Sequence, residues 1–216
     1  MSTNEKETIM FKGTPEIIAQ RREEIVGACE QLYQTMSFKD ITLKEISSVT
    51  SFSRPTIYNY FQTKEEIFLA LFEREYDRWN EDLEKILNNE KDLAETELAE
   101  QIAQSLERRA QLLKLLSMNN FDMEENSREE LLASFKRAYG KSLKLFREIL
   151  GKHCPAMDDT EIGQIIYIFF PFMFGIYPYA EVTAKQKEAM KKAKVDYKYQ
   201  TIYEITYNCL IRLLKN

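Results

Sequence analysis

The sequence contains few of the residues that interrupt helices. Only 6 glycines and 5 prolines occur among its 216 residues. Because these residues form turns and end helices, their scarcity argues against a β protein with many turns and favours long helices. A chain that is 44% hydrophobic and 30% charged is globular rather than disordered. We therefore predict an all-α fold, with enough residues for one large or two modest domains.

Side chains that perform chemistry are also scarce. The chain has one histidine, His153, and three widely separated cysteines, Cys29, Cys154 and Cys209. No second histidine and no cysteine pair stands at metal-ligand spacing, and neither a G-x-S-x-G motif nor a glycine-rich phosphate loop occurs. We therefore expect no catalytic residues, no metal, no cofactor and no enzymatic activity. The cysteines are expected to be small buried hydrophobes in a reducing compartment, with a redox-sensing thiol as the alternative.

The charge is distributed unevenly along the chain. Residues 1–64 hold eight basic and eight acidic side chains, whereas residues 65–216 hold 22 and 27, and the net charge is -5. This asymmetry permits contact with DNA only at the N-terminal end. The first residues lack the hydrophobic run of a signal peptide, so we expect a frayed arm over residues 1–13 and a cytoplasmic protein.

One long apolar stretch, Ile162–Ala180, carries no charge over 19 residues. A membrane span needs about 20 apolar residues, so its composition invites that interpretation. Gln164, Pro171, Gly175 and Pro178 interrupt it, however, and no basic cluster precedes it. We favour a helix that is buried between its own core and a partner subunit, and we expect no membrane contact.

The stretch Thr42–Lys64, TLKEISSVTSFSRPTIYNYFQTK, organises the rest of the chain. Its pattern predicts a short helix over residues 43–49, a turn over 50–52, a second short helix over 54–60 and a third helix from Lys64. Two short helices joined by a tight turn form a helix-turn-helix, whose second helix fits the major groove of DNA. The sequence therefore predicts a DNA-binding regulator.

The second short helix has one apolar and one polar face. Ile57 and Phe61 are predicted to face the core. The side chains predicted to face outward are Arg54, Thr56, Asn59 and Tyr60, with Tyr58 at the edge. Guanidinium, hydroxyl, amide and phenol groups are those that contact base edges and phosphates. The alternative is an ordinary solvated face, which two exposed tyrosines on so short a helix make less attractive.

The apolar periodicity predicts about nine helices in total. Besides the two short ones, these helices cover residues 14–36, 64–88, 92–116, 127–152, 162–180, 186–194 and 199–214. We predict an N-terminal DNA-binding domain over residues 1–64 and a C-terminal regulatory and dimerisation domain over residues 65–216.

The segment Arg22–Leu71 resembles the tetracycline-repressor (TetR) family. The resemblance is carried by I-x-x-A at Ile25–Ala28, F-x-D-I-T-L-x-E-I at Phe38–Ile46 and S-R-P-T-I-Y-N-Y-F-x-T-K-E-E at Ser53–Glu66. One departure lies in the turn, residues 50–53, where Thr-Ser-Phe-Ser replaces the frequent Ala-Gly-Val-Ser and a glycine is lost.

This resemblance implies a repressor that binds a palindromic operator as a homodimer through its last two long helices. A small effector that enters the C-terminal core would release it from double-stranded DNA. The DNA-binding residues that it implies are Thr42, Lys44, Ser53, Arg54, Pro55, Thr56, Tyr58, Asn59, Tyr60 and Lys64. Among these, Thr42, Lys64, Tyr58 and Tyr60 would contact the DNA backbone, and Lys44, Arg54, Thr56 and Asn59 would contact base edges.

Aromatic and flexible side chains of the C-terminal helices are candidates for an effector pocket. They are Trp79, Phe121, Tyr139, Phe146, Phe169, Phe172, Met173 and Tyr177. Since no buried charge is evident among them, we expect a largely apolar ligand, although each residue is more simply explained as core. An all-helical adaptor that binds proteins and no DNA is the alternative function.

Overall fold

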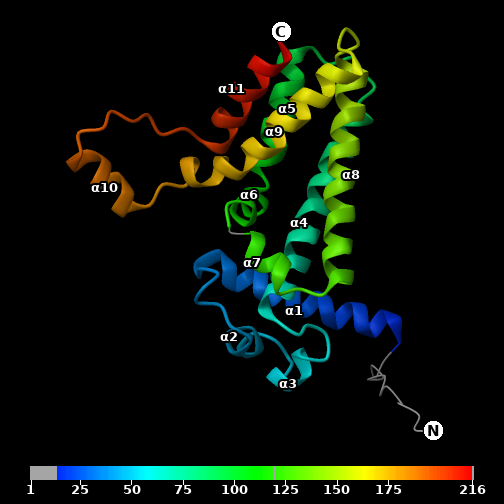
Figure 1. Ribbon diagram of the computed structural model, residues 1–216, viewed down its shortest axis with the longest axis vertical. Helices are drawn as coiled ribbons and strands as arrows, with labels where there is room; N and C mark the ends of the chain where they lie inside the picture. The colour runs from blue at the N-terminus through cyan, green and yellow to red at the C-terminus, as the bar shows by residue number, and fades with distance from the viewer. Residues whose placement is uncertain (1–13, 119, 216) are drawn as a thin grey trace. The chain divides into compact units, whose positions relative to one another are not determined.

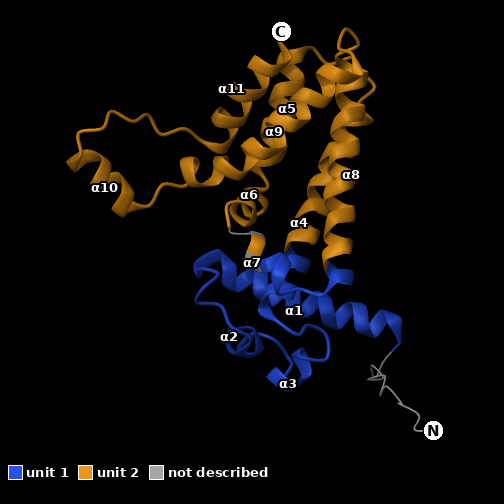
Figure 2. Ribbon diagram, in the orientation of Figure 1, with its two compact units in different colours: residues 1–71, 123–131 blue, residues 72–122, 132–216 orange. Residues whose placement is uncertain are grey.

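The computed structural model describes residues 14–118 and 120–215, and within them every regular element is a helix (Figure 1). The all-α prediction is confirmed. The predicted arm over residues 1–13 lies outside the described residues. The chain divides into two compact units: unit 1 comprises Met1–Leu71 and Met123–Leu131, and unit 2 comprises Phe72–Asp122 and Leu132–Asn216 (Figure 2). The predicted domain division after residue 64 falls at the first residue of the helix that leads from unit 1 into unit 2.

Unit 1 is built on a helix-turn-helix. Its helices are α1 (Pro15–Thr35), α2 (Leu43–Ser48), α3 (Arg54–Ile57) and the first two turns of α4 (Lys64–Leu87). Thr14 and Thr42 cap α1 and α2 through their side chains, as N-terminal threonines do. The fully buried side chains of unit 1 include Ile25, Cys29, Ile46, Ile57, Phe61 and Phe68. Each helix therefore contributes to one core.

The second helix of this motif is shorter than predicted. α3 ends at Ile57, and residues 58–60 continue as a turn rather than as a helix. In that turn, the Asn59 amide donates to the Thr56 carbonyl over 3.2 Å and the Tyr60 amide donates to Ile57 over 2.9 Å. These tighter bonds let the chain bury both Tyr60 and Phe61, which a regular helix places about 100° apart.

Unit 2 is a helical bundle with an aromatic core. It contains the rest of α4, α5 (Glu95–Glu107), α6 (Ala110–Leu116), most of α8 (Glu129–His153), α9 (Asp159–Ala180), α10 (Ala184–Lys192) and α11 (Ile202–Leu214). α7 (Asn120–Glu125) lies where the chain passes between the units. α11 packs on α5 and α9, and α6 packs on α9. Trp79 and Phe169 are fully buried there, with Phe146 stacked on Phe169 at 5.1 Å between ring centroids.

The described residues form eleven helices, more than the nine predicted, because the predicted helix over 92–116 is two helices and α7 forms in the expected break. The chain leaves the helical conformation at Arg109, whose φ is -113° and ψ is 38°. The Arg109 guanidinium lies 2.7 Å from the carboxylate of Asp82 on α4. The apolar periodicity continues through the break, so it does not reveal the break.

The apolar helix α9 belongs to the core of unit 2. By length and composition α9 could span a membrane, but the core helices of soluble proteins pass the same test. Its buried side chains, among them Ile162, Ile166, Phe169 and Met173, follow helical spacing and pack inside the unit. Its other face, however, leaves large apolar side chains exposed. α9 is therefore a core helix with one uncovered apolar face.

Candidate nucleic-acid interface

The turn between α2 and α3 is held by a residue of α1. The Glu24 carboxylate accepts hydrogen bonds from the Ser51 amide over 2.8 Å and from the Ser51 hydroxyl over 2.7 Å. These two bonds hold the pKa of Glu24 below its ordinary value. Among the described residues other than glycine, only Lys194 has a positive φ, so the turn does not require the missing glycine. Sequence reasoning missed Glu24, since nothing local marks it as the partner of a serine 27 residues away.

The exposed face of α3 carries a preorganised arginine. The Arg54 guanidinium donates to the Tyr58 hydroxyl over 3.2 Å and lies 5.8 Å from the centroid of the same ring. Pro55 and Asn59 are exposed beside it, and Thr56 is half-buried with its hydroxyl 2.9 Å from that of Ser53. The structure therefore leaves Arg54, Pro55, Tyr58 and Asn59 exposed on α3 and the turn after it, whereas Thr56 is half-buried and Tyr60 is buried.

Tyr60 faces inward, so the prediction that it faces outward is wrong. Tyr60 is 5% exposed, and its hydroxyl accepts a hydrogen bond from Arg21 on α1 over 3.0 Å. Its carbonyl accepts a further bond from Arg22 over 3.2 Å. The turn after α3 rotates this residue toward α1, whereas helical spacing places it on the outer face. Tyr60 is therefore a packing residue of unit 1.

The start of α2 adds an exposed cation. Lys44 is exposed in the first turn of α2, and its backbone amide donates to the Thr42 hydroxyl over 3.1 Å. The Thr42 hydroxyl in turn donates to the Glu45 carboxylate, which holds the pKa of Glu45 below its ordinary value. Thr42 is exposed, but its hydroxyl already caps α2. The exposed Lys44 side chain is therefore the better placed of the two to contact DNA.

Lys64 at the start of α4 has internal partners. Its ammonium donates to the carbonyls of Phe38, over 2.8 Å, and Ile41, over 3.2 Å. It also lies 4.1 Å from the centroid of the Phe38 ring. An ammonium has three N–H donors, so these bonds leave one for another acceptor. Lys64 thus fixes the segment that leads into α2, and its predicted contact with phosphate stays a prediction.

The predicted pocket residues are spread over different environments in unit 2. Trp79, Phe146, Phe169 and Met173 are fully buried, whereas Tyr139, Phe172 and Tyr177 are half-buried. Phe121 is 82% exposed and lines none of the described cavities. Only Tyr139 lines one of these cavities, which has a volume of about 280 Å³ between α8 and α9. Its lining residues are Tyr139, Leu143, Lys144, Arg147, Ile166, Tyr167, Phe170 and Pro171.

Two other cavities open in unit 2. One, of about 500 Å³, lies among the end of α9, α10 and the segment that follows α10. The other, of about 290 Å³, adjoins His153 and Cys154 at the end of α8. The Nδ1 atom of His153 accepts from the Leu93 amide over 3.3 Å, and burial raises the pKa of the Cys154 thiol. The hydrogen bond to Leu93 gives His153 a structural role.

Two models of known protein families match this chain. Residues 73–198 match the model described as "Tetracyclin repressor-like, C-terminal domain", and residues 25–71 match "Bacterial regulatory proteins, tetR family". The first match alone covers more than half of the chain. The chain belongs to the tetR family. It is a DNA-binding transcriptional regulator and not an enzyme, and its tetR-family N-terminal segment contains the whole helix-turn-helix.

Solved structures share the tetR fold with this chain at low sequence identity. The fatty acid degradation regulator FadR from Bacillus halodurans is 16% identical, with a TM-score of 0.59 over 94% of this chain and 97% of that chain. FadR from Thermus thermophilus, a TetR-family repressor in complex with lauroyl-CoA, is 20% identical, with a TM-score of 0.59 over 90% and 93%. FadR from Bacillus subtilis, in complex with stearoyl-CoA, is 15% identical, with a TM-score of 0.58 over 89% and 97%. No curated protein matches the sequence.

Proposed function

We propose that this regulator is a repressor that binds a palindromic operator as a homodimer. The observation that carries the proposal is the exposed pair formed by Arg54 at the start of α3 and Tyr58 directly after it, which follow a turn that Glu24 holds in position. A guanidinium that is already stacked and hydrogen-bonded loses little conformational freedom on binding, so it is suited to bidentate contact with guanine. The proposed cytoplasmic location follows, because that is where such a repressor meets its operator.

The roles of the individual residues follow from their placement. Lys44, Arg54, Thr56 and Asn59 are proposed to contact base edges, and Thr42, Tyr58 and Lys64 to contact phosphates. Ser53 is the N-cap residue of α3 and Pro55 lies in its first turn, so we propose that they fix the start of the helix that enters the groove. Tyr60 is buried, so we propose that it packs beneath this surface and makes no contact with DNA.

The uncovered face of α9 supports the homodimer. Tyr167 is 82% exposed, Ile168 is 52% exposed and Phe174 is 43% exposed, all on one helix of unit 2. A contiguous apolar face of this kind is typical of protein interfaces. A second copy of the chain is the proposed partner, because homodimers with two-fold symmetry are the commonest oligomers and match the symmetry of a palindromic operator.

The 280 Å³ cavity between α8 and α9 is the proposed effector site. Tyr139, Phe170 and Pro171 give it apolar walls, and Lys144 and Arg147 add positive charge. We propose a largely apolar effector with an anionic end. The relatives from Thermus thermophilus and Bacillus subtilis were solved with lauroyl-CoA and stearoyl-CoA, which are ligands of this chemical kind.

A ligand screen tests the effector proposal. Apolar carboxylates, acyl-CoA thioesters and planar aromatic acids are expected to raise the melting temperature, because a ligand that binds only the folded state stabilises it by mass action. Trp79 is the only tryptophan, and its ring lies 5.8 Å from that of Phe170 in the cavity wall, so its fluorescence is a second readout. Arg147→Gln is expected to weaken the anionic hits, with the exposed Arg108→Gln as control. A screen without hits by either readout would contradict the proposal.

Selection of random duplex DNA on the purified protein tests the proposed function. At roughly physiological salt we expect enrichment of one palindrome whose half-sites lie about one helical turn apart. Sequencing of the retained duplexes measures this directly. An adaptor that binds only proteins would retain random sequence or none. A folded protein that enriches nothing, even after refolding that strips bound ligand, would overturn the proposal.

A further inference from the structure

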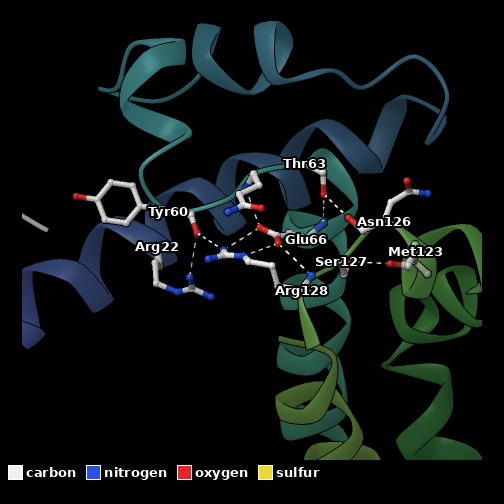
Figure 3. Close-up of polar contacts among 9 residues, drawn as sticks. Arg22, Tyr60, Thr63, Glu66, Met123, Asn126, Ser127 and Arg128 are labelled. Carbon is white, nitrogen blue, oxygen red and sulfur yellow. Dashed lines mark hydrogen bonds and ion pairs between the residues drawn. The ribbon is translucent and has the colours of Figure 1, made fainter. Parts of the chain in front are cut away.

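The segment that begins α8 is bound to the first turn of α4 by an ion pair between the half-buried Arg128 and the buried Glu66. Figure 3 shows Arg128, the residue before α8, beside the carboxylate of Glu66. Its Nε donates to Glu66 Oε1 over 2.7 Å, its Nη2 donates to Oε2 over 2.9 Å, and its backbone amide donates to Oε1 over 3.2 Å. This fork-to-fork geometry is the strong form of an arginine-carboxylate pair. Arg128 and Glu66 both belong to unit 1, so the pair lies within one compact unit.

The same ion pair reaches the end of the recognition segment. Arg128 Nη2 also donates to the carbonyl of Tyr60 over 3.3 Å, and Arg22 donates to that carbonyl from α1. Glu66 Oε2 accepts a bond from the Gln62 amide over 2.7 Å. Both ends of the short link from the turn after α3 to α4 are therefore tied to the Arg128–Glu66 pair (Figure 3).

The pair depends on both members. Glu66 is 1% exposed, so its charge has little access to water. Burial alone would raise the pKa of Glu66, but the bonds from Arg128 and the backbone amides hold it below its ordinary value, and the carboxylate is ionised at neutral pH. Without the Arg128 side chain the buried carboxylate would lose two of its four hydrogen-bond donors and the positive charge beside it, and it would rearrange or take up a proton. The link that it holds would then loosen.

We propose that Arg128 is a positioning residue of the DNA-binding surface, which it adjusts through Tyr60 and Glu66 without touching DNA. This inference rests on the proposed function. α8 continues as one helix from Glu129 to His153, and the same helix carries Tyr139, Lys144 and Arg147 of the proposed effector site. A shift of α8 on effector binding therefore moves the backbone to which Arg128 is attached, which changes its bonds to the recognition segment.

Variants of Arg128 test this inference on the duplex that the unmodified protein selects. Arg128→Gln is expected to lower the affinity for that duplex by about 5- to 150-fold, the range typical of coupling between sites. The slope of affinity against salt is expected to stay unchanged, because Arg128 makes no phosphate contact. Arg109→Gln is the matched control: it removes an arginine that pairs with the buried Asp82 in unit 2, and it should leave DNA affinity unchanged.

Hydrogen exchange provides a readout without DNA. The amides of residues 58–62 are expected to exchange faster in Arg128→Gln than in the unmodified protein, and to exchange normally in Arg109→Gln. If Arg128→Gln does not fold, Arg128→Lys keeps the charge beside Glu66 but loses the fork, and it should show the same changes at smaller size.

The possible failures are distinguishable. An Arg128 variant that is folded and dimeric and binds the duplex as tightly as the unmodified protein would overturn this inference and leave the proposed function intact. A salt slope reduced by about two units, one for each subunit of the homodimer, would also overturn it, since Arg128 would then contact a phosphate directly. An unmodified protein that selects no duplex would overturn the proposed function and this inference with it.

Discussion

Arg54→Ala is expected to weaken binding to the selected duplex by about 2–6 kcal/mol, or roughly 30-fold and more. A bidentate contact with a base contributes about 1–3 kcal/mol, and a homodimer loses one such contact in each half-site. Arg54 is exposed and held by the ring and hydroxyl of Tyr58, so its removal does not open the core of unit 1. Titration of the duplex with the purified variant measures the loss, and thermal unfolding is expected to match that of the unmodified protein.

Two further variants show what Arg54 contacts. Arg54→Lys keeps the charge but loses the planar fork, so it should restore binding only if the partner is a phosphate. Tyr58→Phe removes the hydroxyl that accepts from Arg54 and keeps the ring beneath it. We expect a small loss with Tyr58→Phe and a large loss with Arg54→Lys. Wild-type affinity of Arg54→Ala would remove this residue from the DNA-binding surface.

Trp79→Ala is expected to lower the free energy of unfolding by about 3–5 kcal/mol, the usual cost of truncating a buried large aromatic side chain. Trp79 is fully buried in unit 2, and its indole N–H donates to the Ser105 hydroxyl over 3.0 Å. Its ring also packs near Phe170, at 5.8 Å between centroids. Because a typical domain is stable by only about 5–15 kcal/mol, the loss is a large fraction of the total. Urea unfolding followed by circular dichroism measures it.

Ser105→Ala separates the hydrogen bond of Trp79 from its packing. It leaves the buried indole N–H without its acceptor, which costs about 1–3 kcal/mol, and creates almost no cavity. Trp79→Phe removes the same bond and part of the ring, so its cost should fall between those of Ser105→Ala and Trp79→Ala. If the urea midpoint of Trp79→Ala were close to that of the unmodified protein, the expected loss of stability would be contradicted, and unit 2 would tolerate a large void.

The helices follow from local sequence signals. Threonines at positions 14, 42, 183 and 201 cap the helices that begin after them, as their hydroxyl groups allow. The apolar spacing in α1, α4 and α8 identifies the buried face of each, and the same spacing predicts that Arg54 on α3 and Asn59 directly after it are exposed, as they are. These features are readable from the sequence because caps and helical periodicity involve residues only three or four positions apart.

Pairings between distant residues decide the rest. Tyr60 turns inward because Arg21, Arg22 and Arg128 hold its hydroxyl and carbonyl, whereas local spacing directs it outward. The helix breaks at Arg109, where its guanidinium meets Asp82. The link between Arg128 and Glu66 joins residues 62 positions apart. The sequence by itself thus determines most of the helices, the family and the helix-turn-helix that we propose faces DNA. Only the tertiary structure decides which charged groups meet in the interior, because a buried charge takes whichever partner the folded chain brings within hydrogen-bonding distance.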